Sequence, residues 1–244
     1  MEISSEIKKI IINLFGKILN SKKSKCIFYH DLHSDRRFSD MSTTIDMFEQ
    51  HIDIIRDSNF KIVNEVTKEQ GEIEICFDDG LQGIYRNIEV INRLEVPITL
   101  FIITSLIGED NFLSKEQIQE LSINPFVKIG SHTHTHTDLS LLSDRELELE
   151  LEESKRILTE ICRTEIKSIC FPKGLFNKKV IHIANKLSYK KQYCSIPGSY
   201  YDEDFQSVKK RSLVQFYHEK EFKNILHGGD HILSLWYKLK HFRK

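Results

Sequence analysis

The chain has 244 residues, and its 35 Lys and Arg nearly balance its 36 Asp and Glu. This balance leaves no basic field to recruit nucleic acid, and 40% hydrophobic residues are ordinary for a folded protein. The five cysteines are odd in number and none has C-x-x-C spacing, which argues against a disulfide framework and a zinc ribbon. We therefore expect one domain over residues 1–244, in a reducing, cytoplasmic compartment.

Residues 1–22 predict an amphipathic helix, because apolar side chains recur at helical spacing. Acidic, Lys and Asn residues interrupt the segment, which is not typical of a signal peptide, and no run approaches the roughly 18 apolar residues that span a bilayer. Two interpretations stay open: a helix that covers the core, and a helix that lies in a membrane interface. The basic, aromatic tail 216–244 raises the same alternative, so we expect peripheral contact with the inner membrane through the two ends.

Between these ends, short apolar runs alternate with amphipathic helical stretches. Strands are predicted at 25–30, 60–64, 72–77, 98–103, 127–130, 166–171, 190–194 and 208–214. Helices are predicted at 44–57, 83–94, 114–122, 143–163, 176–187 and 219–226, with capping boxes at Ser114 and Ser143. This alternation indicates parallel strands joined by helical crossovers, and thus an α/β fold: a distorted (β/α) barrel of about seven strands over 25–215.

In such barrels the reactive residues lie where strands end, and three polar segments here follow three apolar runs directly. Asp78-Asp79-Gly80 follows EIEICF, and the segment from Ser131 to His136 follows VKIG. Pro172-Lys173-Gly174 follows IKSICF. We expect these three tips to meet at one end of the barrel.

Two histidines and a carboxylate are a ligand set for a divalent ion such as zinc, with positions left for water. His132 and His136 supply the imidazoles, and one of two adjacent aspartates supplies the carboxylate. Since neighbouring residues leaving a strand point different ways, the other aspartate stays free to accept a proton. Taken singly, Asp-Asp-Gly is most often a turn and the His-rich segment a solvated loop. Their joint occurrence at strand ends favours a metal-dependent amide or ester hydrolase.

The same segments resemble the motifs of the polysaccharide deacetylases, the NodB-homology group of carbohydrate esterase family 4. CFDDG (76–80) resembles the first motif, T-F-D-D-G, and GSHTHTHTDL (130–139) the second, G-[SN]-H-T-x-x-H-x-x-L. FYH (28–30) resembles the Y-H that opens the domain, and CFPKG (170–174) resembles the third motif. The resemblance covers residues 25–195, most of the chain.

What the resemblance implies is a NodB-like barrel that removes an acetyl group from an amino sugar with one divalent metal ion, zinc being expected. Asp78 would be the general base, and Asp79, His132 and His136 would hold the metal. His134 falls on a variable position of the second motif, and we interpret it as lying outside the ligand set.

Some positions depart from the family pattern. The third motif often carries an Arg where this chain has Cys170, so the task of orienting Asp78 has no assigned residue. Pro172 and Lys173 are predicted to contact substrate, the Lys173 backbone N–H being suited to an oxyanion hole. The family's last motif, L-x-H, carries the general acid, and Ile225-Leu226-His227 makes His227 the candidate, with His218 as a weaker one. His30 is expected to line the site or to play a structural role.

Segment 208–229 resembles the C-terminal part of deacetylases from O-antigen or capsule biosynthesis. This resemblance points to a lipid- or nucleotide-linked sugar as the substrate. Two other interpretations stay open: a deformylase or other amidase with the same metal site, and a catalytically inactive relative that binds carbohydrate.

Overall fold

The computed structural model describes residues 4–202 and 208–241, and at their centre is a nine-stranded sheet. Neighbouring strands are parallel and follow the order β10-β9-β8-β7-β6-β5-β1-β11, with β4 also paired to β5. The strands are β1 (Lys25–Tyr29), β4 (Lys61–Ile62), β5 (Glu72–Phe77), β6 (Ile98–Ile102), β7 (Val127–Ser131), β8 (Ser168–Cys170), β9 (Lys191–Tyr193), β10 (Val208–Lys209) and β11 (Arg211–Leu213). A separate pair, β2 (Asp31–His33) and β3 (Ser42–Thr44), follows β1.

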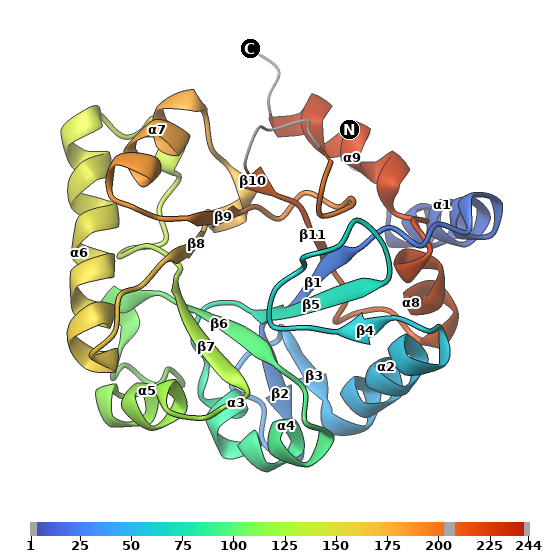
Figure 1. The fold of residues 1–244 in the computed structure, drawn as a ribbon, viewed down its shortest axis with the longest axis horizontal. Coiled ribbons are helices and arrows are strands. Elements are labelled where there is room, and N and C mark those ends of the chain that lie inside the picture. Colours follow the sequence, from blue (N-terminus) through green and yellow to red (C-terminus); the bar gives the residue numbers. More distant parts are fainter. Residues whose placement is uncertain (1–3, 203–207, 242–244) are drawn as a thin grey trace.

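The two ends of this sheet are joined by a single residue, Lys210. Strand β10 pairs with β9 and strand β11 pairs with β1, so the chain steps from one edge of the sheet to the other within one residue. The sheet therefore curls round into a distorted barrel (Figure 1). This confirms the predicted fold, while the expected single strand 208–214 is broken at Lys210. The buried ammonium group of Lys210 donates hydrogen bonds to Asp202 and Ser234, which hold the chain at the point where the two strands separate.

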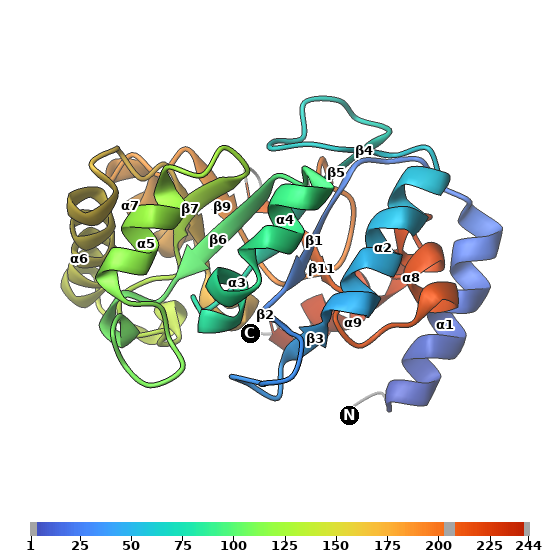
Figure 2. The same ribbon diagram turned by 90° about the horizontal axis from the view of Figure 1, so that it is seen from below.

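Helices surround the barrel, as Figures 1 and 2 show. They are α1 (Ser5–Leu19), α2 (Ile45–Asp57), α3 (Gln82–Arg86), α4 (Ile88–Leu94), α5 (Lys115–Ser122), α6 (Asp144–Cys162), α7 (Lys178–Lys186), α8 (Glu219–Leu226) and α9 (His231–His241). Both predicted capping boxes are present. The predicted helix 83–94 is interrupted at Asn87, whose side-chain amide donates to the carbonyls of Leu32 and Gly83.

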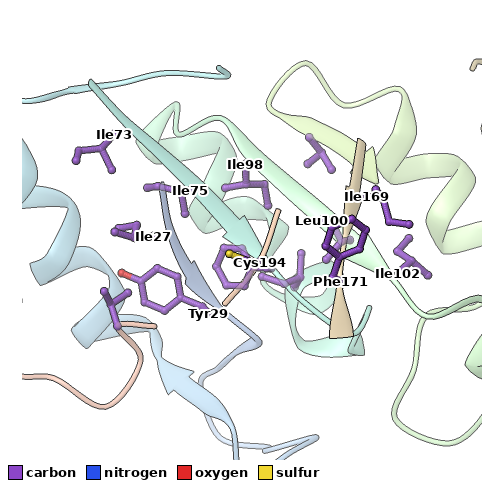
Figure 3. Packing of buried hydrophobic residues seen from close by; sticks show 14 of the residues in the cluster. Ile27, Tyr29, Ile73, Ile75, Ile98, Leu100, Ile102, Ile169, Phe171 and Cys194 are labelled. Atoms are coloured by element: carbon purple, nitrogen blue, oxygen red, sulfur yellow. The ribbon is translucent and has the colours of Figure 1, made fainter. Parts of the chain in front are cut away.

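Both faces of the central strands are buried, as parallel sheets require. Ile27, Tyr29, Ile73 and Ile75 face the surrounding helices, and Figure 3 shows this layer between sheet and helices. Alternate residues such as Cys26 and Phe28 face the barrel interior. The strands are thus fixed in register, and with them the positions of the residues that follow each strand.

The terminal segments form α1, α8 and α9, while residues 1–3 and 242–244 of the predicted terminal segments lie outside the described residues. Across 4–202 and 208–241, none of the helices has the length and apolar character needed to cross a bilayer. The assignment of 1–244 to one domain stays a prediction.

Candidate active site

The ends of β5 and β7 bring the predicted ligands together. These two strands flank β6, and both run in the same direction. Asp79 Oδ1 lies 3.5 Å from His132 Nε2 and 3.9 Å from His136 Nε2. All three ligand atoms lie within 4.8 Å of one another, a spacing that a single ion can bridge.

The state of each ligand fits a divalent cation. Asp79 Oδ1 is buried, and within the described part of the chain it has no hydrogen-bond partner. His132 donates from Nδ1 to the Cys170 carbonyl at 2.9 Å, which leaves the lone pair of Nε2 toward Asp79. Burial, together with the nearby His132 and Lys173, lowers the pKa of His136 to about 4 even though Asp79 and Asp78 oppose the shift. Two imidazole nitrogens beside a carboxylate oxygen that has no hydrogen-bond partner are a ligand set that a zinc-type ion binds.

The neighbouring carboxylate has a different environment. Both oxygens of Asp78 accept hydrogen bonds from Arg211, each at 2.7 Å, and both residues are buried. Burial alone would raise the pKa of Asp78, but Arg211, His132 and His30 more than offset it and lower the pKa to about 2. Asp78 is therefore a fixed anion whose oxygens are already engaged, whereas Asp79 offers a free oxygen.

Arg211 is the site residue that the sequence analysis missed. It extends from β11 into the barrel, where its guanidinium lies 4.3 Å from the ring centroid of Phe28 and 5.2 Å from that of Phe101. It also donates to Cys170 Sγ at 2.7 Å, the position where the family often has its own Arg. The guanidinium thus reaches Asp78 from β11, which is separated from β5 by β1 alone. An Arg inside a predicted strand was the signal that could have identified it.

The loops that carry these ligands have strained backbones. Asp79, Thr133, His136 and Lys173 have φ values of 73°, 68°, 59° and 57°. Side chains with a β-carbon rarely adopt this left-handed region, and such residues gather at functional sites. Local hydrogen bonds stabilise the strained backbone: Thr133 Oγ1 accepts from the His136 N–H, and Ser131 Oγ accepts from the Thr133 N–H.

Three further predicted residues lie at this end of the barrel. His30 directly follows β1, beside Asp78, because Tyr29 and Phe77 are register partners. Pro172 and Lys173 form a short turn after β8, with Pro172 buried and Lys173 exposed. His134 instead bonds to Thr104 through Nδ1 at 2.9 Å and takes no part in the group of ligand atoms.

The prediction of His227 as the general acid is wrong. His227 ends α8, bonds through Nδ1 to the Ser21 carbonyl, and lies 5.8 Å from the ring of Phe60. Phe60 directly precedes β4, which pairs with the start of β5, so His227 lies at the amino end of that strand while Asp78 follows its carboxyl end. The reason is topological: a helix that follows a barrel strand returns to the amino end of the barrel.

A second group of candidate ligands, Cys26, Glu74 and Cys76, lies inside the barrel. Glu74 accepts hydrogen bonds from Tyr193 and from the Val66 N–H. Burial raises the pKa of Cys26 well above its usual value, which keeps its thiol protonated. These groups are already satisfied by the protein, so the cluster at the strand ends is the better metal site.

Comparison with known proteins agrees with this geometry. The family model for polysaccharide deacetylases matches residues 65–192, more than half of the chain. This chain belongs to the polysaccharide deacetylase family. Poly-beta-1,6-N-acetyl-D-glucosamine N-deacetylase of Staphylococcus aureus is 26% identical over 186 residues. That alignment covers 67% of this chain and 64% of the relative, so less than two thirds of the relative is represented.

Solved structures of deacetylases share the fold. Streptococcus pyogenes deacetylase PplD, in complex with acetate, superposes with a TM-score of 0.72 at 20% identity, over 82% of this chain and 96% of that one. IcaB from Ammonifex degensii gives a TM-score of 0.71 at 16% identity, over 86% and 98%. At such identities the agreement concerns the barrel, and the roles of individual residues rest on the geometry above.

Proposed function

We propose that this polysaccharide deacetylase homologue hydrolyses the acetamide group of an N-acetylated sugar, using one divalent metal ion. The observation that carries the proposal is the unlike environment of two adjacent carboxylates. Asp79 has a buried oxygen without a partner beside two imidazole nitrogens, whereas Asp78 is held by Arg211. An amide hydrolase needs both a ligand and a separate base, and this pair supplies them.

Asp79, His132 and His136 would hold the ion, zinc being the expected one. When bound, a divalent ion polarises a substrate carbonyl and lowers the pKa of water, which suits a weakly basic carboxylate. Asp78 then accepts the proton of the attacking water. Its bidentate pairing with Arg211 fixes the carboxylate in place and keeps it charged throughout the neutral pH range.

We assign the release of the amine to His30, in place of His227. Its Nδ1 donates to Gln215 Oε1 at 2.8 Å, which orients the ring and leaves Nε2 to carry a proton to the leaving nitrogen. Its charge is among those that lower the pKa of Asp78, as expected of a group beside the base. Contact with the sugar is proposed for Pro172 and Lys173, on the turn after β8.

The substrate class rests on the relatives. The S. aureus protein is named for action on poly-beta-1,6-N-acetyl-D-glucosamine, which supports an N-acetylglucosamine unit here too. A lipid or nucleotide carrier for that sugar is proposed from the C-terminal resemblance alone. An inactive, carbohydrate-binding relative is the less favoured alternative, because the base and all three ligand side chains are present.

The test is acid release from a β-1,6-linked N-acetylglucosamine oligomer, with acetate and formate quantified separately. We expect acetate from the wild-type protein, a loss of about 10³-fold in Asp78→Asn, and unchanged metal content in that variant. Asp57→Asn, an exposed aspartate at the end of α2, is the matched control. Full activity in Asp78→Asn would rule out the base, and formate release from an N-formyl oligomer alone would favour the deformylase.

A further inference from the structure

Helix α1 is tied to the protein by polar side chains as well as by apolar contacts. Asn13 Nδ2 donates to Glu221 Oε1 at 2.8 Å, and Asn224 Nδ2 donates to Asn13 Oδ1 at 2.8 Å, which ties α1 to α8. Gly16 lies so close to Asn224 that an added β-carbon would stand 2.5 Å from that side chain. The side of α1 that contacts the barrel assembly therefore combines small and polar groups with Ile12, which is buried in the core, and Ile11, which packs against the core.

The apolar stripe of α1 points the other way, into solvent. Ile7, Ile10, Leu14 and Ile18 are 51%, 66%, 55% and 66% exposed. Their spacing places them on one face of the helix, which is the face that a core-covering helix buries. The helix thus covers the core with Ile11 and Ile12, while this stripe stays outside the core. Helix α9 contacts α1 and adds exposed apolar side chains, Ile232, Leu235 and Leu239.

The charges on α1 indicate what covers this stripe. Lys17 is exposed beside it, whereas Lys8 and Lys9 are half-buried, with Lys8 over the ring of Trp236 and Lys9 paired with Glu6. Glu6 is the sole acidic residue of this helix, so its net charge is positive. A symmetric contact between two copies of α1 would bring these lysines together and repel. An anionic lipid leaflet meets both requirements, since it takes up the apolar side chains and attracts the lysines.

The position of α1 relates this face to the active site. Its carboxyl end lies near Ser21, where His227 marks the amino end of the barrel, so its amino end lies toward the end that carries Asp78 (Figure 2). A cavity of about 310 Å³ there is lined by Lys8, Lys9, Leu213 and Phe216. Phe216 directly follows Gln215, the residue that orients His30.

We propose that α1 is an interfacial helix that docks this protein onto an anionic lipid surface through Ile7, Ile10, Leu14 and Ile18. The docked helix lies in the plane of the headgroups, with its polar face still bonded to α8. Docking holds the side of the barrel that α1 and α8 cover against the membrane surface, with the end that carries Asp78 toward the amino end of α1. The inference concerns where the protein binds and does not depend on the proposed reaction.

Vesicle co-sedimentation of the full chain tests the proposal. Vesicles of phosphatidylcholine alone are compared with vesicles that also contain phosphatidylglycerol. We expect binding to the anionic vesicles, weakened at high salt, and a loss of at least about tenfold in Ile10→Gln/Leu14→Gln. The matched control is Ile123→Gln/Leu149→Gln, two exposed apolar side chains away from α1, which should bind as wild type does.

A second variant separates charge from burial: Lys17→Glu, at an exposed position on α1, should weaken binding to anionic vesicles while the fold is retained by circular dichroism. Equal binding of wild type and Ile10→Gln/Leu14→Gln would overturn the proposal, as would the absence of vesicle binding. In the latter case, concentration-dependent self-association lost in the same double variant would assign the face to a second copy. Acetate release is measured separately, so failure of the deacetylase assay leaves this test intact.

Discussion

The two halves of the active site are assembled in different ways. The ligand half, Asp79 with His132 and His136, comes from two short segments that each follow one strand. The proton-handling half, Asp78 with Arg211 and His30, draws on β5, β11 and the end of β1. The first half is held by short-range hydrogen bonds within strained loops, and the second by a buried ion pair between β11 and the end of β5, two strands that flank β1. Local sequence therefore encodes the proposed metal ligands, whereas the proposed proton-handling group depends on the pairing of three strands that are far apart in the sequence.

The ligand half should give the largest effect when broken. His132→Ala removes a ligand nitrogen, so we expect loss of bound metal and a fall in kcat of about 10³-fold or more, since a bound cation contributes several kcal/mol. Elemental analysis and acetate release measure the two effects. His134→Ala is the matched control, because His134 bonds to Thr104 instead. Equal metal loss in both variants would mean that the ligand set is misassigned.

In the proton-handling half, variants of His30 and His227 test which of these two histidines is the general acid. His30→Gln should lower kcat by about 10²-fold, the usual range for one proton-transfer group, and leave metal content unchanged. His227→Gln should have wild-type kcat, because His227 lies at the amino end of the barrel. The pH–rate profile should lose one limb in His30→Gln. A slow His227→Gln with a normal His30→Gln would reverse the assignment.

Arg211→Lys tests whether the ion pair between β11 and the end of β5 positions the base. Lysine keeps the charge but cannot form two parallel hydrogen bonds, so we expect kcat to fall about tenfold at nearly constant KM. The free energy of unfolding should fall as well, because Asp78 would remain buried with poorer pairing. Arg145→Lys, exposed at the start of α6, is the control. An unchanged kcat would reduce Arg211 to a structural role.

The same contrast explains how far the sequence could be interpreted. Patterns within a few residues predicted the strands that precede Asp78 and His132, and the structure confirms both. The capping boxes at Ser114 and Ser143 were predicted in the same way and are also present. Arg211 and Asp78 are 133 positions apart, and no local pattern reports that β11 and β5 both pair with β1. His227 matched a short motif but belongs to a helix that returns to the far end. The outward face of α1 was equally hidden, since amphipathicity does not say which face packs.

The smallest expected effect on kcat concerns the support beneath the proton-handling half, where His51 links Tyr29, which precedes His30, to Tyr217, two residues after Gln215. Its Nε2 donates to the Tyr217 carbonyl and its Nδ1 accepts from the Tyr29 hydroxyl, each at 2.8 Å. Burial lowers the pKa of His51 from 6.5 to about 4, with the charge of His218 adding to the shift and the Tyr217 carbonyl opposing it. Between these values the unfolded chain binds the additional proton, so stability is lost as pH falls.

When the pH falls from 7 to 4, the contribution of His51 should lower the free energy of unfolding by about 3 kcal/mol, since each pKa unit corresponds to about 1.4 kcal/mol. Urea unfolding of wild type and His51→Gln measures it, because their difference removes the contributions of all other titrating groups. The stability advantage of wild type at pH 7 should shrink by that amount at pH 4, while kcat at pH 7 changes little. Parallel pH curves for the two proteins would show that the buried imidazole is not the group that titrates, and that the proton-handling half is supported by the Arg211 pair alone.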